Sequence, residues 1–100
     1  MQLNNKLSID KNHFEVNSIN ITVGQDFTIT QNGIVMYGGY GVATMKLTVN
    51  GIEVGQCYAG NQTNASLYNS WRVYKGDVVK IEQTRGGTSE GNVHLFRPYL

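Results

Sequence analysis

The feature that most constrains the fold of this chain is an alternating apolar and polar segment, residues 45–54, that an Asn-Gly pair divides. Asn-Gly tolerates the positive φ values of a type I′ turn, whose twist matches that of a two-residue β-hairpin. Pairing outward from this turn predicts four cross-strand pairs: Val49 with Ile52, Leu47 with Val54, Thr48 with Glu53, and Lys46 with Gly55. Apolar residues then share one face and polar residues the other, so the segment predicts an antiparallel hairpin.

Short segments of the same kind recur about every ten residues, separated by Gly or Asn, which is typical of a sandwich or a barrel. The predicted strands are 19–23, 27–30, 34–37, 67–74, 78–84 and 93–99 in addition to the hairpin. The apolar run 34–37 indicates a strand buried on both faces. Because helical periodicity is missing, we expect an all-β fold, an antiparallel β-sandwich.

Length and patterning favour a single domain, because 100 residues can bury one core. Residues 13–100 form the predicted β-sandwich domain, and the weakly patterned residues 1–12 are either a linker or an added edge segment. The polar stretches 59–66 and 85–92 are predicted surface loops. With 12 glycines the core must be thin, so stability can need a partner chain.

Charge argues against two classes of partner. The net charge is +1, from 8 basic and 7 acidic residues that are scattered along the chain. This pattern lacks the basic stripe that nucleic-acid binding requires, so we expect no nucleic-acid partner. No apolar stretch approaches the length needed to span a membrane, so no membrane insertion is expected either.

No centre for catalysis or metal binding stands out. His13, Cys57 and His94 lack ligand spacing, and a single cysteine excludes an internal disulfide. Hairpin pairing predicts that Cys57 lies near Thr44, on the face away from Leu47, as a structural thiol. The carboxylates fall at turns or on polar strand faces, and neither glycine cluster opens a helix that would bind phosphate. We therefore expect no enzyme, no cofactor and no metal.

Aromatic and amide side chains are the remaining candidates for function. Six tyrosines and one tryptophan are many for this length, and Tyr and Trp favour interfaces because they present apolar area with a polar tip. Amides in nearby loops match sugar hydroxyls. The candidate ligand-binding residues are Trp71, Tyr68, Tyr40, Asn61 and Asn64. The alternative is that the tyrosines complete a thin core and that the loops are merely solvated.

From Ile19 onward the order of motifs also resembles a known family. The matching segments are 27–29 leading to Asn32-Gly33, 47–54, 73–81, and Phe96-Arg97-Pro98-Tyr99. Their order is similar to that of the C1q/tumour-necrosis-factor-like jelly-roll heads at the tips of phage tail fibres and related receptor-binding proteins. The resemblance implies a jelly-roll sandwich that assembles as a homotrimer and recognises a host cell-surface glycan or protein through its distal loops.

Three functions are therefore open. The first is a non-enzymatic bacteriophage attachment head at the virion surface, in the tail or the capsid. The second is a freestanding lectin-like carbohydrate-binding module of a bacterium, secreted or at its surface. The third is a structural virion accessory protein that decorates a capsid. No shaft-like segment precedes the predicted head, so an excised domain and a freestanding protein are both consistent with the sequence. The sequence does not fix the ligand.

Overall fold

A computed structural model of the chain describes residues 18–40, 44–58, 66–85 and 92–99. These residues form eight strands: β1 (Ile19–Asn20), β2 (Phe27–Thr28), β3 (Gly33–Tyr40), β4 (Thr44–Val49), β5 (Ile52–Tyr58), β6 (Ser66–Val73), β7 (Val78–Arg85) and β8 (Val93–Pro98). The described residues include no helix of the length and apolarity that crossing a membrane requires. The predicted loops at 59–66 and 85–92 fall largely outside the described residues.

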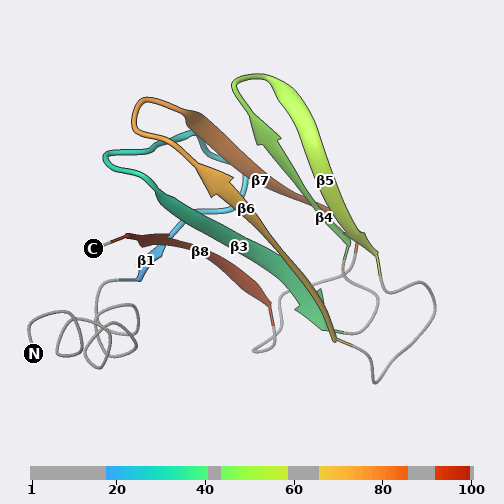
Figure 1. Ribbon diagram of the computed structural model, residues 1–100. Coiled ribbons are helices and arrows are strands. Elements are labelled where there is room, and N and C mark those ends of the chain that lie inside the picture. Colours follow the sequence, from blue (N-terminus) through green and yellow to red (C-terminus); the bar gives the residue numbers. More distant parts are fainter. Residues whose placement is uncertain (1–17, 41–43, 59–65, 86–91, 100) are drawn as a thin grey trace, which may run out of the picture.

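The strands lie in two layers, each an antiparallel sheet of four strands (Figure 1). Sheet A has the order β1-β8-β3-β6, and sheet B has the order β2-β7-β4-β5. The antiparallel pairs β4–β5, β3–β6, β2–β7 and β1–β8 are nested around the Asn50-Gly51 turn, so the chain is one long hairpin folded over itself. Two four-stranded sheets in this order make a jelly roll. The predicted all-β sandwich is confirmed.

The core lies between the two sheets and is built from alternate residues of both. Among the described residues its buried members are Ile21, Ile29, Val35, Tyr37, Met45, Leu47, Cys57, Val73, Val79, Ile81 and Phe96. The Phe96 ring of sheet A lies 5.9 Å from the Phe27 ring of sheet B, within the range of favourable aromatic pairs. The inward residues of the six longer strands, together with Ile21 and Ile29 after β1 and β2, therefore hold the layers together, and the outward residues are left for other roles.

The hairpin forms as predicted around Asn50-Gly51, but its register differs beyond Glu53. Val49 faces Ile52 and Thr48 faces Glu53, after which a bulge pairs Leu47 with Gly55 rather than with Val54. One extra residue moves every later side chain to the other face. The prediction for Lys46 is wrong for the same reason, because Lys46 faces Gln56.

The bulge also corrects the predicted position of Cys57. Cys57 faces Met45 rather than Thr44, and it lies in the core on the same face as Leu47. Its thiol donates to the backbone oxygen of Tyr37 at 3.6 Å, and burial raises the pKa of Cys57. A buried thiol with a raised pKa holds less thiolate and is less reactive.

The apolar run at 34–37 is buried on one face only. Val35 and Tyr37 are core residues, whereas Ile34 and Met36 point outward and are half-buried. The prediction of burial on both faces is therefore wrong, because nothing in the described residues fully covers the outer surface of sheet A. This outer surface carries the candidate site.

Candidate ligand-binding site

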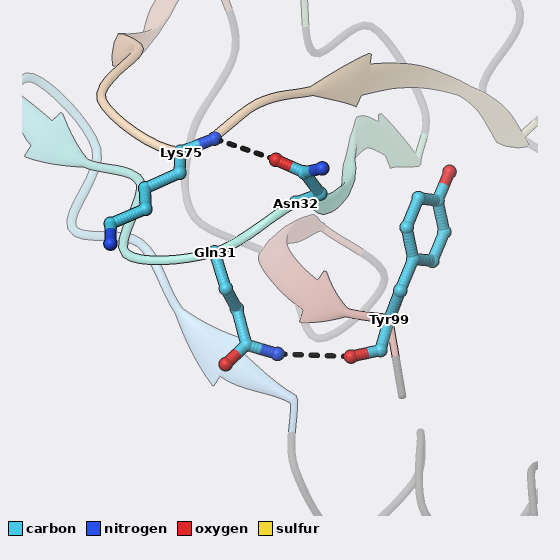
Figure 2. A pocket seen from close by; sticks show the side chains of 4 residues that line it. All are labelled: Gln31, Asn32, Lys75 and Tyr99. Atoms are coloured by element: carbon cyan, nitrogen blue, oxygen red, sulfur yellow. Dashed lines mark hydrogen bonds between the residues drawn. The ribbon is translucent and has the colours of Figure 1, made fainter.

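An open hollow of about 550 Å³ lies at the end of the sandwich where the chain leaves β8. Its lining comes from three places in the sequence: Gln31 and Asn32 before β3, Lys75 between β6 and β7, and Tyr99 after β8 (Figure 2). These segments meet because β3 lies between β6 and β8 in sheet A. The jelly-roll order therefore assembles the hollow.

Hydrogen bonds fix the hollow in shape. The Tyr99 backbone amide donates to the Asn32 backbone oxygen at 2.9 Å, and Gln31 Nε2 donates to the Tyr99 backbone oxygen at 2.9 Å. The Lys75 amide donates to Asn32 Oδ1, also at 2.9 Å. The three segments are thus tied together before any ligand arrives, so binding need not order them.

Several polar groups of the hollow remain available to a ligand. Among the described residues no hydrogen bond engages Gln31 Oε1 or Asn32 Nδ2, and no ion pair engages Lys75 Nζ. In Figure 2 the Lys75 side chain and the Tyr99 ring lie on opposite sides of the two amides. An acceptor and a donor that lie between a cation and an aromatic ring can match a ligand that is rich in hydroxyl groups.

The hollow continues onto the outer face of sheet A. The register places Arg72 and Arg97 directly on either side of Ile34. The Arg72 side chain is fully exposed and hydrogen bonds with the side chains of Tyr74 and Tyr99, which raise the pKa of Arg72. The tyrosines thereby hold this guanidinium close to the rim of the hollow.

A second, smaller hollow of about 140 Å³ lies next to the arginines and is lined by Ile34, Met36, Ser70 and Arg97. Arg97 Nε is buried there and has no hydrogen-bond partner. A buried donor without a partner costs free energy, about 1–3 kcal/mol. The second hollow therefore combines an apolar floor with a guanidinium group whose hydrogen bonds are incomplete.

The charges of the two sheets differ. The strands of sheet A contain no Asp or Glu, so Arg72 and Arg97 have no acidic neighbour on their own sheet. In sheet B, Lys46 Nζ lies 3.8 Å from Glu53 Oε1 and 3.9 Å from Glu82 Oε1. Lys46 is thus neutralised on the outer face of sheet B, whereas neither arginine of sheet A has an acid in the strands of its own sheet.

The structure separates the candidate residues that the sequence indicated. Tyr68 is exposed on the outer face of sheet A, whereas Trp71 faces Val35 in the register and points to the inner side at the edge of the sheet. These two rings cannot stack on the same sugar face. Tyr40 lies at the end of β3, where its side chain is not described, and Asn61 and Asn64 lie outside the described residues.

Sequence reasoning did not select the residues that form the two hollows. Asn32, Lys75, Arg97 and Tyr99 entered only as members of the segments that resemble a known family, and Arg72 was not singled out. One signal was present, because strand alternation places Arg72 and Tyr74 on the face opposite Val73. Only the pairing of β3 with both β6 and β8 brings Arg97 and Tyr99 beside them.

The described histidine has a structural role. His94 Nδ1 lies 2.6 Å from the Ile21 oxygen, and because a carbonyl only accepts, Nδ1 carries the proton and donates. The Ile21 amide returns a bond to the His94 oxygen at 2.9 Å. Among the described residues no three His, Cys, Asp or Glu side chains gather as metal ligands would.

Comparison of the chain with families of known proteins, with individual curated proteins and with solved structures found no significant match. The fold and the two hollows are therefore the basis on which a function is inferred.

Proposed function

We propose that this chain is a non-enzymatic recognition domain that binds a saccharide on a cell surface. The observation that carries the proposal is the hollow of Gln31, Asn32, Lys75 and Tyr99, which hydrogen bonds hold in shape and which offers unused polar groups. Binding sites combine a concave surface with a few convergent polar groups that fix the orientation of the ligand. Neutral amides beside an aromatic ring supply that combination for sugar hydroxyls and a sugar face.

The wider setting that we propose is an attachment head of a bacteriophage, at the virion surface, that assembles as a homotrimer. Large exposed apolar side chains support self-association: Ile52 is 68% exposed, Leu67 44% and Trp71 41%. They lie on β5 and β6, the edge strands of the two sheets. Exposed apolar patches mark interaction sites, and closed symmetry would bury this patch in every copy. In this arrangement Trp71 serves assembly rather than sugar binding.

Binding to immobilised bacterial-surface glycans tests the function. We expect the chain to bind a subset of glycans and the Lys75→Gln variant to bind them at least about tenfold more weakly, since a charge-assisted hydrogen bond contributes about 1.5–3 kcal/mol. Lys80→Gln is the matched control, because it removes the same charge from sheet B. Failure to bind any glycan, or equal binding by both variants, would contradict the proposal.

Light scattering after size exclusion tests the assembly. A trimer at micromolar concentration that Trp71→Ser converts to monomer is the expected result. A monomer under these conditions would favour the alternative, a freestanding lectin-like module. A chain that joins virus particles without binding any glycan would instead be a structural accessory protein.

A further inference from the structure

We propose that the ligand is an acidic saccharide and that the outer face of sheet A binds it, with a carboxylate held between Arg72 and Arg97 above Ile34. This inference rests on the proposed function and names the class of its ligand. Both arginines point outward at the same level of the sheet, one on each strand beside β3. Neither arginine has an acidic neighbour in the strands of sheet A, and the two hollows adjoin the pair.

The spacing suits a carboxylate of a sugar unit. Neighbouring strands lie about 4.8 Å apart, so the backbones of Arg72 and Arg97 are about 10 Å apart across β3. Two arginine side chains can converge from that distance on one carboxylate, which the planar guanidinium binds with paired hydrogen bonds. Alternatively they can hold the carboxylates of two successive units.

Charge complementarity comes from the composition of the sheet. No acidic residue occurs in any strand of sheet A, and Arg97 Nε is buried without a hydrogen-bond partner. The Arg97 side chain is half-buried, so it would turn outward for a carboxylate oxygen to reach Nε, and the bond then formed would remove the cost of leaving this donor unpaired. Lys46 of sheet B, by contrast, does not need an anionic ligand, because Glu53 and Glu82 already neutralise it within the chain.

The two hollows lie on either side of the arginine pair. Along β3 the next outward-facing residue on one side of Ile34 is Asn32, which lies beside Tyr99. On the other side it is Met36, which faces Ser70. A short oligosaccharide would place hydroxyl groups among the amides of the first hollow. It would lay an apolar ring face on Ile34 and Met36 in the second. The proposed site therefore extends along β3 from Asn32 to Met36, with the carboxylate near its centre.

A second copy of the chain fits this face less well. Copies related by a two-fold axis through the face would bring four arginines together, and like charges oppose such contact. Nucleic acid fits less well too, because its affinity depends on neutralising many phosphates and this face offers two arginines with Lys75 at its end. The experiment below distinguishes both of these occupants, a second copy of the chain and a nucleic acid, from a saccharide.

Calorimetry with a galacturonic acid oligomer, a neutral galactose oligomer of equal length and inorganic polyphosphate tests the inference. We expect the acidic oligomer to bind at least about tenfold more tightly than the neutral one, with an affinity that falls as salt is added. Arg72→Gln and Arg97→Gln should each weaken binding about tenfold. Arg97→Lys should recover only part of the loss, because an ammonium cannot form the paired hydrogen bonds.

Lys80→Gln is the control for charge alone and should bind as the unchanged chain does. The exposed side chain of Arg72 makes its variant a control for folding, which thermal unfolding of both arginine variants would verify. Binding of the neutral oligomer with equal affinity would overturn the inference but leave the proposed function standing. Preference for polyphosphate, or an arginine variant that changes the oligomeric state and not the affinity, would also overturn it. Absence of any saccharide binding would defeat both.

Discussion

Sheet A and sheet B have the same number of strands and share one core, but their outer faces differ in chemistry. On sheet B, Lys46 lies between Glu53 and Glu82, so these three charges pair with one another in solvent. On sheet A two arginines stand beside half-buried apolar residues without an acid in any strand. The inner faces of the sandwich thus serve the fold, whereas the outer face of sheet A keeps two arginines that no acid in its strands neutralises.

The largest expected effect is the loss of stability when an inward-facing residue of sheet A is replaced, compared with the loss at an outward-facing neighbour. Replacing Phe96 with Ala removes a ring that is completely buried, and large-to-small core changes of this kind cost about 3–5 kcal/mol. The neighbouring Leu95 points outward and is only half-buried, so Leu95→Ala should cost about 1 kcal/mol. Urea unfolding of both variants measures the contrast. Equal losses would show that the outer face is packed as tightly as the core.

A smaller effect is expected where sheet A brings two strands close together. A side chain at Gly38 would collide with the Leu67 backbone oxygen and the Tyr68 Cα, and the φ of Gly38 is 153°. We expect Gly38→Ala to cost about 2–3 kcal/mol. At Gly24 the φ is also positive, 86°, but nothing lies within 4 Å, so Gly24→Ala should cost about 1 kcal/mol. If thermal unfolding finds equal costs, β3 and β6 do not approach as described.

The turn at the centre of the nested pairs comes next. Asn50 has a φ of 53°, its Oδ1 accepts from the Val78 amide at 2.9 Å, and its Nδ2 donates to Asp77 Oδ1 at 3.0 Å. Asn50→Ala loses both hydrogen bonds and strains the turn, so we expect a loss of about 1–2 kcal/mol by urea unfolding. Asn50→Gly keeps the backbone relaxed and should lose less. The reverse order would show that the positive φ of Asn50 costs nothing, and no loss in either variant would show that the side-chain hydrogen bonds contribute nothing.

Alkaline pH should weaken the core through Tyr37. Burial raises its pKa above the ordinary 10.0, although a hydrogen bond with Asn69 opposes the rise. Below pH 10 the Tyr37 phenol is neutral in both the folded and the unfolded chain, so the contribution of the raised pKa to the stability of the fold is fully present. As pH rises from there towards the raised folded pKa, the unfolded chain loses its proton first, so the free energy of unfolding falls. Tyr37→Phe should make that fall shallower. An equal fall in the variant would assign it to other groups, such as Cys57.

The smallest effect is expected on sheet B. Lys46→Gln removes both of its ion pairs, whose atoms are partly exposed, so the free energy of unfolding should change by less than about 1 kcal/mol. The change should shrink further at high salt. A loss of several kcal/mol would mean that the charges of this face are structural and that the contrast between the sheets is overstated.

Much of the fold could be predicted because the strands alternate and a turn signal marks the centre of the chain. The Asn50-Gly51 turn connects the innermost of four nested strand pairs, and the other pairs lie outside it in order. The bulge after Glu53 could not be predicted, since no local pattern shows that Gly55 must face Leu47; in the fold, a side chain at Gly55 would collide with the Tyr37 hydroxyl. The bulge then reversed the expected position of Cys57.

The candidate site was harder to predict because it depends on contacts between distant strands. Arg72 and Arg97 are 25 positions apart in the sequence and meet only through β3. Aromatic content pointed to Trp71 and Tyr68 together, yet successive pairing positions send these rings to opposite sides of sheet A. A residue list without pairing could therefore not identify which aromatic and charged groups share a surface.

Titration of the ¹⁵N-labelled chain with the galacturonic acid oligomer, followed residue by residue in NMR spectra, tests whether the outer face of sheet A binds an acidic saccharide. We expect the largest shifts at Ile34, Arg72, Arg97 and the amides of the first hollow, with Lys46, Lys80 and Glu82 of sheet B nearly unchanged. Shifts centred on sheet B, or none at saturating oligomer, would contradict the claim.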